Sequence, residues 1–338
     1  MQVNRHILLT GAGFTKNFGG FLADEMWAHI FNDPLVQSSK KLREKMLREE
    51  RLFPDFDYER AYEDIVNAKD SGPEAENFTR ALINAYKKID QAIINWSEPG
   101  PRSKTLRNLG AFIKLFKGEN GRTGFFFTLN QDWLIERFGY DSLFNARHFL
   151  YPAETDAPDL IDCPRRAFED SDFHPIANEV KMRVDSEHSF YVKLHGSFHW
   201  KTADGRHLML IGNRKSEEIN HHALLNKSWD LFKSVFDERD LRLLIIGYGF
   251  RDKHINEAII QAIQKRNLKV GIVSPKPIRE MSKYLESADS DTCEGRFRDV
   301  LFDEGLLSYF NYSLEEILSG ESLGSPAFLD IKKCFFDG

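Results

Sequence analysis

Four apolar segments of the chain are each about as long as a β-strand and end in glycine or small polar residues. They read ILLTGAG, FFFTLNQD, YVKLHGS and LLIIGYGF, and they begin at Ile7, Phe125, Tyr191 and Leu243. Apolar runs of this length are typical of strands that are buried on both faces of a parallel sheet. In an open α/β sheet, ligands bind beyond the carboxyl ends of the strands. The four ends are therefore expected to converge on one binding site.

The rest of the chain alternates between strand-like and helix-like segments. Residues 5–13 are predicted to be a strand that ends in a tight glycine turn, and the other predicted strands are 124–128, 190–194, 243–247 and 268–274. The predicted helices include 21–31, 131–138, 221–236 and 252–264. Such alternation favours a parallel sheet whose connections are helices. We expect an α/β fold with a Rossmann-like, mostly parallel sheet, helices on both faces and a helical insertion or cap.

The periodicity also suggests how the chain is divided. Residues 1–34 and 119–277 are expected to form the core, and 35–118, with repeated amphipathic helical patterns, a helical insertion within it. Residues 278–338 are expected to form a helical or irregular extension. The segment 150–187 is rich in Pro, Asp and charged residues and predicts a long loop.

Composition limits the classes of protein that fit. The chain has 338 residues and a net charge of −6, which argues against a dominant nucleic-acid surface, so nucleic acid is expected as a partner only indirectly. Cys163, Cys293 and Cys334 are too scattered for a Cys-x-x-Cys zinc site or a disulfide framework. No apolar run approaches the roughly 20 residues of a membrane span. We expect a cytoplasmic protein with no membrane partner and no metal site.

The first segment ends in the glycine turn Gly11-Ala12-Gly13, followed by Thr15. Backbone N–H groups at such a strand-to-helix turn can meet a pyrophosphate. The dinucleotide fingerprint has a third glycine three positions after the second, where this chain has Lys16. The alternative is a tight turn that needs glycine only for its backbone geometry.

The second and third segments end in residues that are suited to acid–base chemistry. Asn130 and Asp132 lie where strand gives way to helix, so helix capping is the alternative to a catalytic role. His195 follows a strand and precedes a glycine, and an imidazole is the most available general base near neutral pH. A structural hydrogen bond is the alternative for His195, and His199 is the second choice for the role of base.

The fourth segment ends in Gly247, Tyr248 and Gly249, and Asp252 follows at a helix start. Glycines here would let an adenosine or ribose approach closely. Ser274, at the end of the next strand, would offer a hydroxyl to the same ligand. The alternatives are a favourable charge at a helix N-terminus for Asp252 and a simple strand-end turn for Ser274.

Taken together, these motifs resemble the SIR2-like (sirtuin-fold) family, and within it the bacterial branch of NAD-consuming antiphage-defence proteins. Its NAD-binding Gly-Ala-Gly turn resembles residues 11–13, and its Asn-x-Asp element matches Asn130 and Asp132. Its Leu-His-Gly element matches His195, the implied catalytic histidine, and its Gly-Tyr-Gly-Phe-x-Asp element matches residues 247–252. The resemblance implies that NAD binds at Gly11, Ala12, Gly13, Thr15, Asn130, Gly247, Tyr248, Gly249, Asp252 and Ser274.

The chain also departs from the deacylating sirtuins. Their four-cysteine zinc module has no counterpart among the three scattered cysteines, so no structural zinc is expected. Their Pro-Asp-Phe-Arg segment is replaced by Gly20-Phe21-Leu22-Ala23-Asp24. Both departures weaken the case for an acyl-lysine substrate. The resemblance then implies an NAD+ hydrolase that releases nicotinamide and ADP-ribose, with Asn130, Asp132 and His195 as catalytic residues and abortive infection by NAD+ depletion as its role.

Other readings remain open. Relatives of similar length occur as SIR2-like subunits beside a HerA-type ATPase, so such a partner, with nucleotide binding or nuclease activity in the assembly, is the main alternative. A homo-oligomer is expected in either case. NAD-dependent protein deacylation or ADP-ribosyl transfer is a more distant alternative.

Overall fold

The computed structural model describes residues 2–52, 58–66, 72–96, 102–138, 149–150, 153–154, 166–176, 181–182, 184, 189–287 and 293–338. Most of the predicted loop 150–187, including Cys163, lies outside these residues. None of the helices in the described ranges is long and apolar enough to cross a membrane.

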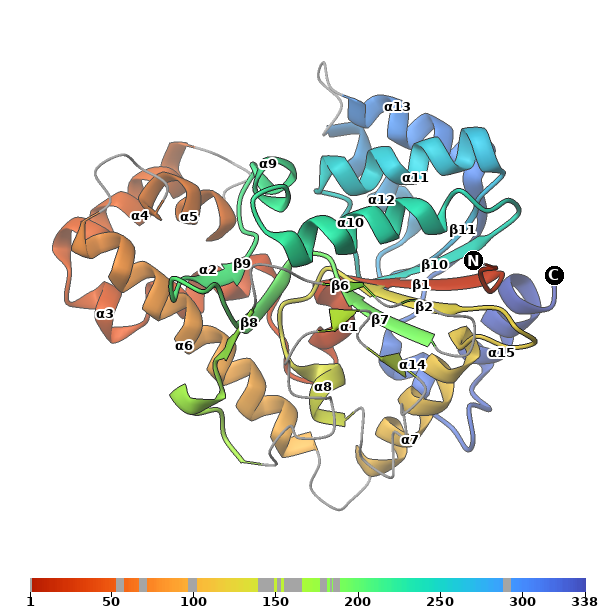
Figure 1. The fold of residues 1–338 in the computed structure, drawn as a ribbon, viewed down its shortest axis with the longest axis horizontal. Coiled ribbons are helices and arrows are strands. Elements are labelled where there is room, and N and C mark those ends of the chain that lie inside the picture. Colours follow the sequence, from red (N-terminus) through yellow and green to blue (C-terminus); the bar gives the residue numbers. More distant parts are fainter. Residues whose placement is uncertain are drawn as a thin grey trace.

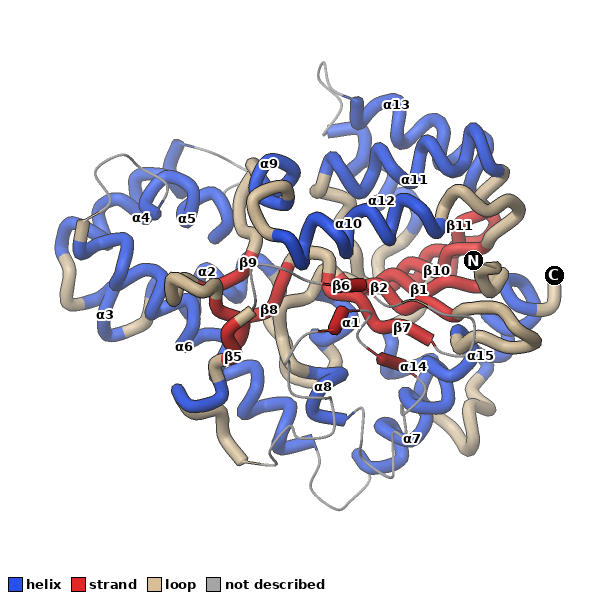
Figure 2. The backbone as a smooth tube through the Cα atoms, viewed as in Figure 1, coloured by secondary structure: helices blue, strands red, loops and turns tan. Residues whose placement is uncertain are grey.

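A seven-stranded sheet forms the centre of the molecule, and all its pairings are parallel (Figures 1 and 2). In spatial order the strands are β12 (Leu306–Phe310), β11 (Lys269–Val273), β10 (Arg242–Ile246), β1 (His6–Thr10), β2 (Gly124–Thr128), β7 (Ser189–Lys193) and β3 (Phe149–Leu150). Without the short edge strand β3, this is the 3-2-1-4-5-6 order of the dinucleotide-binding Rossmann sheet. The expected Rossmann-like α/β fold is confirmed.

Neighbouring residues of each strand face opposite sides of the sheet, and both sides are covered. Leu8, Phe126 and Tyr191 belong to one buried cluster, and Leu9 and Phe127 belong to the other. This is why these strands read as continuous apolar runs rather than as alternating patterns. Strands buried on both faces leave only their ends free for polar chemistry.

Two groups of helices cover the two faces (Figure 1). One face carries α10 (Ala223–Val235), α11 (Lys253–Arg266), α12 (Ile278–Ser287) and α13 (Cys293–Val300). The other carries α1 (Ala12–Lys16), α7 (Arg102–Ile113), the 3₁₀ turn η1 (Lys114–Phe116), α8 (Leu134–Phe138), α14 (Leu314–Leu318) and α15 (Pro326–Ile331).

A helical lobe lies beyond the carboxyl ends of the strands, at the left of Figure 1. It consists of α2 (Ala23–Phe31), α3 (Pro34–Gln37), α4 (Lys40–Leu52), α5 (Tyr58–Val66) and α6 (Pro73–Trp96). Between the lobe and the main sheet lie α9 (Lys215–Ile219) and a small sheet of β5 (His174–Pro175), β8 (Gly196–Lys201) and β9 (His207–Met209). Most of the lobe comes from the predicted insertion 35–118.

The remaining elements are short. A 3₁₀ turn, η3 (Asp170–Asp172), and an antiparallel pair, β4 (Ala153–Glu154) with β6 (Lys181–Met182), lie in the chain between β3 and β7. The segment 278–338, expected as a helical or irregular extension, contributes strand β12 to the main sheet. Two π-helical turns, η4 (Leu301–Gly305) and η5 (Lys332–Phe336), flank this strand in space. This part of the chain therefore completes the core sheet.

Candidate functional site

The ends of the predicted strands lie side by side. The parallel pairings align Thr10 with both Thr128 and Ile246, Thr128 with Lys193, and Ile246 with Val273. These five residues form one row across the sheet, and each is the last residue of its strand. The loops that carry the predicted site residues therefore begin at the same edge, as expected for a parallel sheet.

Three glycines pack against one another where the strand order reverses, between β1 and β10. The N–H of Gly11 donates to the carbonyl of Ile246 (3.0 Å), and the N–H of Gly13 donates to that of Gly247 (3.0 Å). A Cβ on Gly11 or Gly13 would lie 2.7 Å from backbone atoms of Gly247. Gly247 itself has a φ of 68°. Close backbone packing thus explains why these positions are glycine, and the N–H groups of Gly11 and Gly13 are already engaged.

Asn130 joins the first and second strand ends. Its Nδ2 donates to Oγ1 of Thr15 (2.9 Å), and its own N–H donates to Oγ1 of Thr128 (3.1 Å). Asn130 is half-buried, whereas Thr15 is only 2% exposed. The structure therefore brings together Asn130 and Thr15, two of the predicted site residues. Ala12, between the two glycines, is exposed at the start of α1.

Asp132 accepts hydrogen bonds from groups at the start of α8 and at the end of β7. Its Oδ1 accepts a hydrogen bond from the N–H of Leu134 (3.0 Å) at the start of α8, which is the capping role that the sequence left open. Its carbonyl accepts from Nζ of the buried Lys193, which also forms an ion pair with Glu136 (3.0 Å). Asp132 thus supports the turn that presents Asn130.

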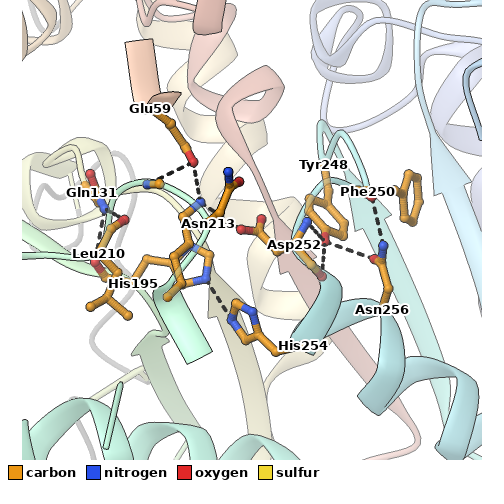
Figure 3. Close-up of polar contacts among 12 residues, drawn as sticks. Glu59, Gln131, His195, Leu210, Asn213, Tyr248, Phe250, Asp252, His254 and Asn256 are labelled. Carbon is orange, nitrogen blue, oxygen red and sulfur yellow. Dashed lines mark hydrogen bonds and ion pairs between the residues drawn. The ribbon is translucent and has the colours of Figure 1, made fainter. Parts of the chain in front are cut away.

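Gln131, which no sequence motif singles out, connects three parts of the site. Its Nε2 donates to the carbonyls of His195 (3.1 Å) and Leu210 (2.9 Å), and its Oε1 accepts from the hydroxyl of Tyr86 (2.7 Å). Tyr86 lies on α6 of the helical lobe. Figure 3 shows Gln131 beside Leu210 and His195. The amide fixes the loop after β7 against both the sheet edge and the lobe.

His195 faces a second histidine. Its Nε2 lies 3.2 Å from Nε2 of His254, in the first turn of α11 (Figure 3). His195 is 3% exposed, and burial lowers its pKa well below the usual range. Burial also lowers the pKa of His254 to about 4. Both rings are therefore neutral at pH 7, the state in which an imidazole can act as a base.

A buried lysine lies between two carboxylates next to the pair. Nζ of Lys215 lies 2.7 Å from Oδ1 of Asp252 and 2.7 Å from Oε2 of Glu59. Burial alone would raise the pKa of Asp252, but attraction to Lys215 outweighs it and holds that pKa well below its usual range. Burial would likewise lower the pKa of Lys215, but the two carboxylates raise it. Asp252 and Lys215 are therefore charged, and the two ion pairs of Lys215 connect α5 of the lobe to the fourth strand end.

His199, the second choice for the base, is held at both ring nitrogens. Its Nε2 accepts from Nε1 of Trp133 (3.2 Å), and its Nδ1 lies 2.9 Å from Oγ of Ser197. Burial lowers its pKa well below the usual range. These contacts give His199 a structural role that the sequence did not indicate.

The loop after the fourth strand is held by hydrogen bonds among its own residues and the start of α11. The hydroxyl of Tyr248 accepts from the N–H of Asp252 (3.1 Å) and donates to Oδ1 of Asn256 (3.0 Å), whose Nδ2 donates to the carbonyl of Phe250 (2.8 Å). Tyr248 is therefore a brace within this loop. Gly249 differs from the other glycines of the site, because no atom lies within 4 Å of the position that its Cβ would occupy. Its missing side chain leaves open space beside the loop.

Ser274 has a local role as well. Its Oγ accepts from the N–H of Lys276 (3.2 Å), which is the strand-end turn that the sequence left open. It lies directly after Val273, the last residue of β11 in the row of strand ends. The structure thus places every predicted site residue at one edge of the sheet. Side-chain contacts of Asn130 with Thr15, and of His195 and Asp252 with their partners, connect different segments there. Backbone hydrogen bonds connect Gly11 and Gly13 to the fourth strand end.

Comparison with protein families agrees with this geometry. The family model for the SIR2-like domain matches residues 124–292, half of the chain. The chain belongs to the SIR2-like family. Among curated proteins, none matches it. Membership of the SIR2-like family indicates an NAD-related function, since SIR2-like domains bind NAD and are typically NAD-using enzymes.

The match to the SIR2-like domain covers three of the four strand ends. It includes Asn130, His195 and Asp252, while the glycine turn at 11–13 precedes it. Within the described ranges, no group of three or more His, Cys, Asp or Glu side chains could hold a metal ion. The polar groups of this SIR2-like site are instead amides, imidazoles and paired charges.

Proposed function

We propose that the protein is an NAD+ hydrolase that cleaves the bond between nicotinamide and ribose. The observation that carries the proposal is the buried, neutral His195 at the same sheet edge as Asn130 and the glycine turn. Cleavage of such a glycosidic bond passes through an oxocarbenium-like transition state, and water is the nucleophile that completes the hydrolysis. A neutral histidine can take the proton that the attacking water or a ribose hydroxyl gives up.

Each loop of the site has a task in this reaction. Asn130, tied to Thr15, would hold the ribose or the attacking water. The open space at Gly249 would admit part of the dinucleotide, and the turn from Gly11 to Gly13 would lie along its phosphates. Asp132 would support the nicotinamide end through the turn that it caps. Positioning of this kind supplies a large share of the rate in hydrolytic enzymes.

The proposal is tested with purified protein and NAD+. We expect nicotinamide release by the wild type and its loss in Asn130→Ala and in His195→Ala, because the first removes a positioning group and the second the base. His222→Ala, at the start of α10, is the matched control and should retain turnover. Turnover that is unaffected by both site substitutions would contradict the assignment.

We further infer that NAD+ depletion is the biological effect, as in antiphage defence. Hydrolysis needs no second substrate besides water, so an active enzyme would exhaust the pool of NAD+ in its host. The test is the NAD+ content of phage-infected cells that carry either the wild type or His195→Ala. Equal NAD+ content in both would contradict this role.

A further inference from the structure

The contact between His195 and His254 is the feature of the site that the proposed roles leave unexplained. The two Nε2 atoms are 3.2 Å apart, and the ring planes are tilted by 46°. His254 is held from its other side by Trp229 of α10, at 5.1 Å between ring centroids and 71° between planes. The ring is therefore fixed from two directions.

Only one of two facing imidazole nitrogens can carry the proton of a hydrogen bond. If Nε2 of His254 is the donor, the proton of neutral His195 lies on Nδ1 and its only lone pair is used in this bond. If Nε2 of His195 is the donor, its Nδ1 has a free lone pair. Only the second arrangement makes His195 a base while the contact is kept.

We propose that His254 is a positioning residue that accepts a hydrogen bond from Nε2 of His195 and so keeps the lone pair of His195 on Nδ1. This inference rests on the proposed base role of His195. In the reaction, the proton from water or from a ribose hydroxyl is transferred to Nδ1 of His195. The imidazolium that forms keeps its Nε2–H bonded to His254, so the pair gains one proton and one positive charge.

The charges around the pair suit this task. The charged groups that face the two rings are Asp252, just before α11, and Lys215 of α9; Glu59 of α5 contacts that lysine. The negative Asp252 favours a positive charge on either ring, whereas Lys215 opposes it. Burial disfavours a positive charge on either ring. Because Lys215 is paired with two carboxylates, the charges next to the pair offset part of that cost when the imidazolium forms.

The tautomers of the pair give a test that does not depend on turnover. Nitrogen-15 NMR of the full chain at pH 7 reports which ring nitrogen carries each proton. We expect His195 protonated at Nε2 and His254 protonated at Nδ1. The opposite assignment, with His195 protonated at Nδ1, overturns the inference.

Kinetics give the second test. His254→Phe keeps a ring of similar size against Trp229 but removes the acceptor, so kcat should fall at least about tenfold while KM for NAD+ changes little. His254→Gln, whose amide oxygen can accept the same bond, should recover part of the loss. His222→Phe is the matched control and should leave kcat unchanged.

The outcomes separate the two hypotheses. Unchanged kcat in His254→Phe, or equal loss in the Phe and Gln variants, overturns the positioning role. If the wild type does not cleave NAD+, the proposed function fails, and the NMR assignment still decides whether His254 orients His195. If His254→Phe does not fold, His254→Gln and the wild-type tautomers still decide.

Discussion

Gly247 is the position at which the packing of the strand ends is most sensitive to a single methyl group. Its φ of 68° lies in the left-handed region, and a Cβ there would lie 2.4 Å from the backbone nitrogen of Phe14 and 2.6 Å from Cα of Gly13. We expect Gly247→Ala to lower the free energy of unfolding by about 2–5 kcal/mol. About 1–2 kcal/mol comes from the backbone conformation and about 1–3 kcal/mol from overpacking against backbone that cannot move aside.

Gly249→Ala is the matched control, two residues further along the same loop. No atom lies within 4 Å of its Cβ position, so we expect a change within about 0.5 kcal/mol. Urea unfolding followed by tryptophan fluorescence measures both variants, with the slope of the transition as a check on cooperativity. A Gly247→Ala protein as stable as Gly249→Ala would refute the close packing of β1 and β10 at this edge.

Three further predictions concern the charged and polar groups around the site. Lys215→Met removes the partner of two buried carboxylates and should lower the unfolding free energy by about 3–5 kcal/mol. The control Lys16→Met breaks the exposed ion pair with Glu25 and should lower it by at most about 1 kcal/mol. Urea unfolding of the two variants measures both changes. Gln131→Leu leaves the buried carbonyls of His195 and Leu210 without their donor, and it should lower the unfolding free energy by about 1–3 kcal/mol for each carbonyl. The control Gln91→Leu, on the exposed side of α6, should not lower it in this way. Because the pKa of His254 falls from 6.5 to about 4 on folding, the unfolded chain binds the extra proton first as pH drops. Stability should therefore fall between pH 6.5 and pH 4, and His254→Gln should remove about 3 kcal/mol of that loss; an unchanged pH dependence of unfolding in this variant would contradict it.

The strands and their ends could be predicted from the sequence because their signals are local. The apolar run from Phe125 to Phe127 ends at Thr128, and β2 ends there in the structure. Parallel pairing then follows from the helices between the runs, and convergence follows from parallel pairing. Strand β12 was missed, because five residues reading LLSYF are identified as a strand mainly by their pairing with β11.

The contacts within the site could not be predicted in the same way. Lys215 is 156 positions from Glu59 and 37 from Asp252, and no local pattern links them. Gln131 stood between two residues that the resemblance singled out, and only the carbonyls around it reveal its role. The partner of His195 likewise depends on how α11 packs beside the loop after β7. Tertiary contacts decide which polar side chains at the strand ends can reach a ligand and which are used in hydrogen bonds within the protein.

Product analysis of NAD+ incubated with the purified protein is the decisive test of NAD+ hydrolysis by His195. We expect the wild type to form nicotinamide and ADP-ribose in equal amounts, and His195→Ala to lower this turnover at least about 100-fold while remaining folded. Equal turnover by the wild type and His195→Ala would contradict it.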